Sequence, residues 1–161
     1  NVARRARGFG MTVLAYDPFV KELPEEFQDF VKLCSFNEVV ESCDFLSVHM
    51  PLTPETKYIV NADVMSRMKK GAYVINTARG GIVEEEALYN ALVSGHLNGA
   101  AMDVVESEPM GKEHKLLSLP NVVVTPHIGM YSEEAIDAVS QICARNVVAC
   151  LTGGEIVNRV V

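Results

Sequence analysis

The sequence lacks the features of a nucleic-acid-binding or membrane protein. Its formal net charge is −7, with 14 lysines and arginines against 21 acids, so it has no excess of basic residues to hold phosphates. No apolar run is long enough to cross a membrane, and the chain does not open with the basic and then apolar segments of a secretory signal. We therefore expect a cytoplasmic protein with no nucleic-acid partner and no membrane partner.

The sequence also lacks closely spaced cysteines. Its four cysteines form no CxxC pair, which argues against the common zinc and redox motifs, and we expect no metal site. We expect the thiols to be reduced, buried and structural. They are Cys34, Cys43, Cys143 and Cys150.

What the chain does contain is a set of short, apolar, strand-like runs. Its 161 residues suit one ordinary domain. Because the runs are apolar throughout rather than alternating with polar residues, we expect strands buried on both faces of a parallel sheet. They cover residues 11–16, 45–49, 72–76, 99–104 and 122–125, with a weaker sixth run at 31–33.

Helical patterns fill the gaps between these runs. Helices are expected over residues 61–70, 84–94 and 132–151, and residues 1–9 have the pattern of the later part of another helix. Gly71 should end the first, a solvated acidic run should start the second, and a Ser-Glu-Glu cap should begin the third. The alternation of strands and helices predicts an α/β fold of the Rossmann type, with a doubly wound parallel sheet.

Polar residues that follow the apolar runs are the candidates for chemistry, because ligands of open parallel sheets bind beyond the carboxyl ends of the strands. Each candidate also has a structural interpretation: an aspartate can stabilise a turn, an arginine can be solvated at the surface, and a histidine can be held by a hydrogen bond. The pattern alone leaves the functional and the structural interpretations open. His96 and His114 read as surface residues. The candidates are Asp17, His49, Arg79, Asp103 and His127.

Arg79 and His127 have neighbours that favour a functional interpretation. Arg79 lies in Thr-Ala-Arg-Gly-Gly, where glycines allow a ligand close to the backbone and a guanidinium could hold a carboxylate by two parallel hydrogen bonds. A carboxylate near His127 would orient its ring and favour the imidazolium, and Glu108 is the candidate.

These segments, in their order and at their separations, resemble the NAD-dependent D-2-hydroxyacid dehydrogenase family. Its members include phosphoglycerate, glyoxylate/hydroxypyruvate, D-lactate and formate dehydrogenases. The resemblance covers almost the whole chain and is far more specific than a lone glycine motif. It is carried by residues 9–11 (FGM), 15–18 (AYDP), 49–56 (HMPLTPET), 71–81 (GAYVINTARGG), 99–104 (GAAMDV), 106–109 (ESEP), 120–122 (PNV) and 126–129 (PHIG).

The resemblance implies an oxidoreductase that transfers a hydride between NAD(H) and a D-2-hydroxyacid/2-oxoacid pair. Arg79 would bind the substrate carboxylate and polarise the carbonyl. His127 would give the carbonyl oxygen a proton during reduction and take it back during oxidation. Glu108 would hold and tune His127.

The resemblance also implies NAD as cofactor and a set of residues around it. Asp17 would bind the adenosine ribose hydroxyls and favour NAD over NADP, and Asp103 would meet the nicotinamide carboxamide. The other cofactor-binding residues would be Met50, Pro51, Thr56, Thr77, Ala78, Arg79, His127 and Gly129.

One departure from the family pattern concerns the start of the chain. The family's G-x-G-x-x-G loop and the strand before it should precede Asn1, so we expect a Rossmann sheet truncated at its N-terminus. Residues 1–130 would be a partial NAD-binding domain, and 131–161 a C-terminal helix and tail returning toward an absent substrate domain. We expect the chain alone to be inactive and its parent to be a homodimer acting on a small-molecule substrate.

Two other functions are compatible with parts of this pattern. A non-enzymatic, NAD-responsive binding module is the first, because the C-terminal-binding corepressors resemble this family and keep a similar catalytic set. A short-chain reductase is the second, and it would need a Tyr-x-x-x-Lys pair. No tyrosine of the chain has a lysine four residues later.

Overall fold

The computed structural model describes residues 1–157, and the chain forms two compact units. The first unit is Asn1–Pro126 and the second is His127–Val161. Residues 158–161, the end of the predicted C-terminal tail, lie outside the described residues. The predicted division of roles between 1–130 and 131–161 stays a prediction.

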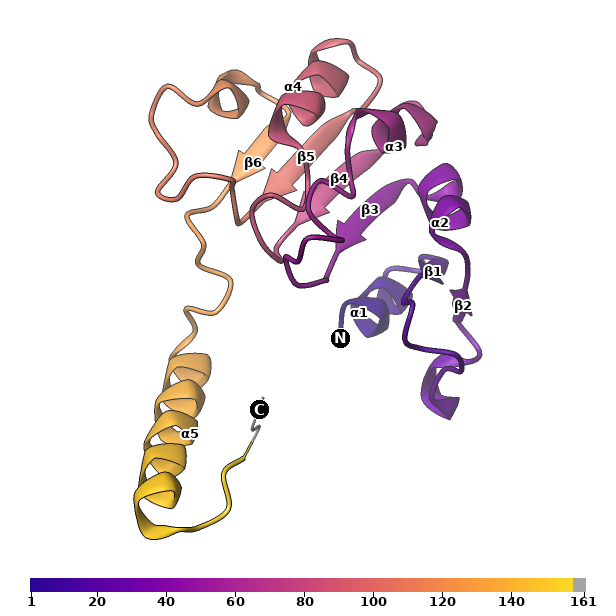
Figure 1. Ribbon diagram of the computed structural model, residues 1–161. Coiled ribbons are helices and arrows are strands. Elements are labelled where there is room, and N and C mark those ends of the chain that lie inside the picture. The colour runs from indigo at the N-terminus through magenta and orange to yellow at the C-terminus, as the bar shows by residue number, and fades with distance from the viewer. Residues whose placement is uncertain (158–161) are drawn as a thin grey trace. The chain divides into compact units, whose positions relative to one another are not determined.

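The strands of the first unit are all parallel and alternate with helices, which confirms the predicted α/β, Rossmann-like fold (Figure 1). All six predicted runs form strands, each within two residues of the expected bounds. They are β1 (Val13–Ala15), β2 (Val31–Leu33), β3 (Phe45–Val48), β4 (Tyr73–Asn76), β5 (Gly99–Met102) and β6 (Val122–Val124).

Four of these strands form one sheet in the order β3-β4-β5-β6. Their register aligns Val48 with Asn76, Asn76 with Met102 and Met102 with Val124. The carboxyl ends of all four strands therefore meet along one edge, and the loops that leave them begin side by side. This edge is where a parallel sheet places its ligands.

The remaining two strands, β1 and β2, form a separate two-stranded sheet. Among the described residues, β1 pairs only with β2 and β3 pairs only with β4. Each therefore has one edge without a strand partner within residues 1–157.

The helices begin where side chains can satisfy their first N–H groups. Ser35, Asn61 and Ser132 accept hydrogen bonds from the backbone N–H three residues later, at the starts of α2, α3 and α5. Gly153 ends α5 in the left-handed conformation, as its position after the helical run predicts. The helices are α1 (Val2–Gly8), α2 (Phe36–Ser42), α3 (Ala62–Arg67), α4 (Glu85–Val93) and α5 (Glu133–Thr152), with 3₁₀ turns η1 (Glu25–Phe27) and η2 (Lys115–Ser118).

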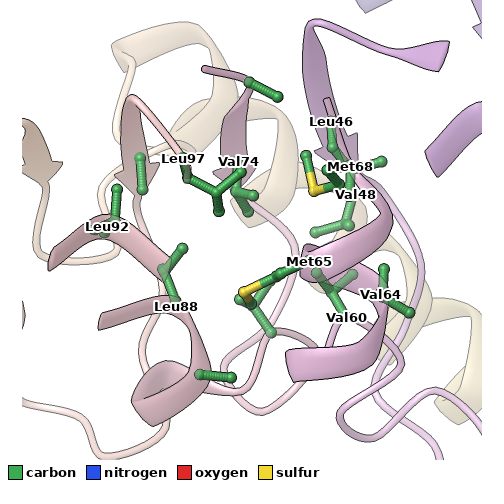
Figure 2. Close-up of a cluster of buried hydrophobic side chains, with 14 of the residues drawn as sticks. Leu46, Val48, Val60, Val64, Met65, Met68, Val74, Leu88, Leu92 and Leu97 are labelled. Atoms are coloured by element: carbon green, nitrogen blue, oxygen red, sulfur yellow. The ribbon is translucent and has the colours of Figure 1, made fainter. Parts of the chain in front are cut away.

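The hydrophobic core lies between α3, α4 and one face of the four-stranded sheet (Figure 2). Met65 and Leu88 project from the two helices toward Val74 of the sheet, and all three are almost completely buried. Burying a side chain of this size contributes about 1.5–3 kcal/mol, so this layer anchors both helices.

The opposite face of that sheet is partly exposed, so the expectation that both faces are buried was wrong. Phe45 is 47% exposed and Val123 is 64% exposed, while Tyr73 is half-buried. Phe45 and Tyr73 stack with ring centroids 5.0 Å apart, so they cover one another. The apolar runs correctly predicted a parallel sheet, but within the described residues only one of its faces is packed.

Two further expectations were wrong. The helix predicted over 61–70 ends at Arg67, because Met68 turns in an extended conformation to bury its side chain and Gly71 donates its N–H to the His96 carbonyl. Cys143 and Cys150 are exposed rather than buried, since α5 has no buried residue.

No helix within residues 1–157 is both long and apolar enough to span a membrane.

Candidate active site at the carboxyl edge of the sheet

A pocket of about 310 Å³ opens at the carboxyl edge, between the loops that follow β3 and β4. These loops are neighbours because Val48 and Asn76, the last residues of the two strands, are aligned. Five of the predicted cofactor-binding residues line this pocket, so the structure brings them together. The lining consists of His49, Met50, Pro51, Thr77, Ala78 and Arg79.

A buried amide shapes the loop that carries Arg79. The Asn76 side chain is fully buried, its Nδ2 donates to the Arg79 carbonyl at 2.9 Å, and its Oδ1 accepts from the Ala78 N–H at 3.0 Å. Buried polar groups need such partners, and here they close a tight turn. The Arg79 side chain is left exposed at the pocket, with Nη1 donating to the Ala78 carbonyl.

The Arg79 loop lies directly against the loop that follows β5. A Cβ atom built on Gly80 would overlap the carbonyl oxygen of Val105, so only glycine permits this approach. The Val105 N–H donates to Glu108 Oε1 at 3.2 Å. The peptide groups of Val105 therefore link the arginine loop with the carboxylate predicted to act in catalysis.

Glu108 and Asp103 occupy different environments in the loop after β5. Glu108 is exposed, whereas Asp103 is 8% exposed and accepts a 2.5 Å hydrogen bond from the Thr125 hydroxyl. The Asp103 N–H continues the sheet by donating to the Asn76 carbonyl. Asp103 is thus held firmly at the strand ends, and its contact with a carboxamide stays a prediction.

Thr56 has a structural role in the loop after β3. Its hydroxyl donates to the Pro51 carbonyl at 2.7 Å and accepts from the Thr53 N–H at 2.8 Å. It fixes the turn that carries Met50 and Pro51, and it does not belong to the pocket lining. Its predicted place along the cofactor cleft is not tested by this geometry.

Asp17 follows β1 and is not among the residues that line the pocket. Its Oδ1 accepts from the Phe19 N–H at 2.8 Å, the turn interaction that the sequence alone left open. The carboxylate is exposed. Its ribose-binding role stays a prediction.

His127 is the first residue of the second unit, three positions beyond β6. Its side chain is exposed, and its backbone has φ of 55°, a left-handed conformation that is costly for a residue with a side chain and that clusters at functional sites. Gly129 lies in the same unit. The predicted contact between His127 and Glu108 joins the two units and stays a prediction.

His49 lies at the rim of the pocket and has a local partner. Its Nε2 lies 2.9 Å from the Ser47 hydroxyl. Burial lowers the pKa of His49 below its usual value, because the charged imidazolium is poorly solvated there. The structural interpretation of His49 therefore fits its surroundings.

Four residues that were not predicted to belong to the site form a connected polar cluster. Glu85 was expected to be a solvated helix start, but it is only 9% exposed. His114 was expected at the surface, but it is half-buried with its Nε2 2.9 Å from Glu85 Oε2. Glu106 and Tyr58 complete the cluster, with the Tyr58 hydroxyl 3.0 Å from Glu106 Oε2.

A signal for Glu85 was present in the sequence. Glu85, Leu88 and Leu92 are spaced as residues on one face of a helix, and the two leucines are core residues. The same spacing places Glu85 at the buried end of that face.

Within residues 1–157, no three His, Cys, Asp or Glu side chains gather as metal ligands would.

Comparison with known families gives the identity of the domain. The family model described as the NAD binding domain of D-isomer specific 2-hydroxyacid dehydrogenase matches residues 1–129. The chain belongs to this family. The dehydrogenase-family resemblance predicted from the sequence motifs is thereby confirmed, together with NAD as the cofactor of the domain.

Relatives of this NAD-binding domain are enzymes of greater length. D-3-phosphoglycerate dehydrogenase of Methanocaldococcus jannaschii is 41% identical over 153 residues, 95% of this chain and 29% of the relative. Hydroxypyruvate reductase of Thermotoga maritima is 47% identical over 139 residues, 84% of this chain and 44% of the relative. The chain spans less than half the length of these two relatives.

A solved structure supports the fold and the cofactor of the domain. The D-isomer specific 2-hydroxyacid dehydrogenase of Lactobacillus delbrueckii ssp. bulgaricus, in its NAD-complexed form, matches with a TM-score of 0.85 and 34% identity. The match covers 98% of this chain and 52% of that structure.

The pocket residues are of kinds that could hold a flat ring such as nicotinamide. Thr77 and Ala78 are small, so they leave room for a flat ring at the strand ends, while Met50 and Pro51 supply an apolar wall. Arg79 adds the only lysine or arginine side chain of the lining.

Proposed function

We propose that the full-length protein containing this domain is an NAD-dependent D-2-hydroxyacid dehydrogenase that interconverts a D-2-hydroxyacid and its 2-oxoacid. The observation that carries the proposal is the position of Arg79. Its guanidinium lines the carboxyl-edge pocket, and its loop is packed through Gly80 on the loop that carries Glu108. A cationic side chain and a carboxylate thus lie in adjacent loops of a domain whose family binds NAD.

Arg79 would hold the substrate by its carboxylate and place C2 at the inner end of the pocket. Two parallel N–H donors match the two carboxylate oxygens, and a third donor can polarise the neighbouring carbonyl. The chemistry that NADH would supply when bound is a hydride for C2. The carbonyl oxygen then gains negative charge and needs a proton.

His127 would donate that proton from a ring nitrogen and recover it when the reaction runs toward oxidation. Glu108 would favour the charged imidazolium and fix its orientation. The balance is one hydride and one proton added to the carbonyl during reduction, which yields the hydroxyl group of the 2-hydroxyacid.

We also infer a homodimer that acts in the cytoplasm on a small 2-oxoacid, without a nucleic-acid or membrane partner. The net charge of −7 supports the exclusion of nucleic acid. The exposed apolar side chains of α5, such as Ile136, Val139 and Ile142, support burial of this helix against further protein surface. The isolated chain is expected to be inactive.

The proposal is tested with the full-length protein by following NADH oxidation with glyoxylate, hydroxypyruvate, pyruvate and phosphohydroxypyruvate. At least one acid should be reduced, and His127→Ala should lower kcat by about 10²- to 10⁴-fold, the usual value of a positioned acid–base group. The affinity for NADH, measured by fluorescence titration, should be nearly unchanged. An inactive wild type, or a His127→Ala variant with normal kcat, would overturn the proposal.

A further inference from the structure

Two glutamates fasten the loop after β5 to the start of α4 by exchanging hydrogen bonds. Glu85 Oε1 accepts from the Glu106 N–H at 2.6 Å, and Glu106 Oε1 accepts from the Glu85 N–H at 3.0 Å. We name this reciprocal pair the Glu85–Glu106 clasp. It joins residues 21 positions apart, so it is a tertiary contact and not a local turn.

The clasp forms because α4 lacks a cap of its own. Glu84 precedes the helix but makes no side-chain capping bond, so the first N–H groups need another acceptor. The Glu106 carboxylate supplies it from the neighbouring loop. The positive end of the helix dipole also eases the approach of two carboxylates.

The remaining oxygen of each carboxylate has a partner as well. Glu85 Oε2 meets His114 Nε2 at 2.9 Å, and His114 Nδ1 accepts from the Leu116 N–H, which places the ring proton on Nε2. Glu106 Oε2 accepts from the Tyr58 hydroxyl, and this hydrogen bond raises the pKa of Tyr58 above its ordinary value, so the phenol stays a donor.

The clasp is one residue away from the junction between the two catalytic loops. Val105 precedes Glu106; its N–H holds Glu108 Oε1 and its carbonyl lies against Gly80. A shift of Glu106 would therefore move the support of Glu108 and the surface on which the Arg79 loop rests. None of the four cluster residues lines the carboxyl-edge pocket.

We propose that the Glu85–Glu106 clasp sets the placement of Glu108 relative to Arg79, which makes Glu85 and Glu106 positioning residues for the reaction. This inference rests on the proposed function. Its alternative is that the clasp merely caps α4. Leu88 and Leu92 anchor that helix in the core without the clasp, so the helix should persist when the clasp is removed.

The two roles are separated by kinetics of full-length Glu106→Ala, Glu106→Gln and Glu86→Ala, with the best of the four 2-oxoacids as substrate. Glutamine keeps an acceptor for the Glu85 N–H, so Glu106→Gln should keep the hydrogen bond and the kcat that Glu106→Ala loses. Glu86 is the matched control, because it lies in the same helical turn but binds only the exposed Lys115.

Glu106→Ala should lower kcat by about 10- to 100-fold, as expected for a small misplacement of reacting groups, with the dissociation constant of NADH within about threefold of wild type. Glu106→Gln and Glu86→Ala should both keep kcat within about threefold of wild type. A kcat for Glu106→Ala equal to that of Glu86→Ala would overturn the inference. Equal damage from glutamine and alanine would overturn it too.

Tyr58→Phe keeps the inference testable if Glu106→Ala does not fold. This change removes one hydrogen bond to Glu106 and should reduce kcat without lowering the melting temperature, whereas an unchanged kcat would contradict the clasp. If the wild type is active and Glu106→Ala has a normal kcat, the inference about the clasp is overturned and the proposed function stands. If the wild type reduces none of the four acids, both the proposed function and the inference about the clasp are overturned.

Discussion

Asp17 combines a turn position with a predicted role in cofactor choice. Its carboxylate is exposed after β1 and is oriented by the Phe19 N–H. A carboxylate accepts hydrogen bonds from ribose hydroxyls but repels a 2′-phosphate. The full-length protein should therefore prefer NADH to NADPH, and Asp17→Ala should reduce that preference by about 10-fold or more, the value of a hydrogen bond to a charged group.

The measurement is kcat/KM with each cofactor. Asp137→Ala, an exposed aspartate of α5, is the control and should leave the ratio unchanged. A wild type that favours NADPH would contradict the assignment of Asp17, and so would an Asp17→Ala variant with an unchanged ratio.

The residues named from the sequence and the residues that support them differ in kind. Arg79 and Glu108 could be predicted because they occur in recognisable motifs after strands. Asn76 acts through buried hydrogen bonds within its own turn, and Glu85 acts through a hydrogen bond to a loop that only the fold brings near. A polar residue in an apolar run, or at the buried end of a helical face, signals such a role but does not name its partner.

At the scale of elements, the approach of the Arg79 loop to the loop after β5 makes a prediction about Gly80. Alanine there would force its Cβ into the Val105 carbonyl, so Gly80→Ala should lower the free energy of unfolding by about 1–3 kcal/mol, as overpacking usually does. It should also lower kcat, because both catalytic loops meet at this point.

Gly111→Ala is the matched control, since no atom lies within 4 Å of its added Cβ and its φ is not positive. Denaturant unfolding and steady-state kinetics should show Gly111→Ala close to wild type. Two alanine variants with the same stability would show that the loops can separate without cost.

The strands were predicted better than the helices. Each apolar run was long enough to mark a strand, because the strands of a parallel sheet are rich in apolar residues on both faces. The helix α2 was missed although Ser35 and Glu38 form a capping pattern, and the helix at 61–70 was drawn too long because Met68 was assigned to a helical face. The signal for α2 was local and present in the sequence, whereas the end of α3 was set by the burial of Met68, which the local pattern does not contain.

At the scale of the whole molecule, apolar surface is left open within the described residues. One face of the four-stranded sheet exposes Phe45 and Val123, and α5 exposes Val147 and Leu151. Exposed apolar patches of this kind mark surfaces that pack against other protein. The relatives are at least twice as long as the segments they share with this chain, so further protein is available to cover such surfaces in those relatives.

The central claim is that Arg79, Glu108 and His127 act on one substrate, and a crystal structure tests it most directly. The structure needed is that of the full-length protein with NAD and oxamate, an unreactive analogue of a 2-oxoacid. We predict the oxamate carboxylate in two hydrogen bonds with Arg79 and a Glu108 carboxylate about 2.6–3.2 Å from a His127 ring nitrogen. Well-ordered density with His127 and Arg79 on opposite faces of the sheet would contradict it.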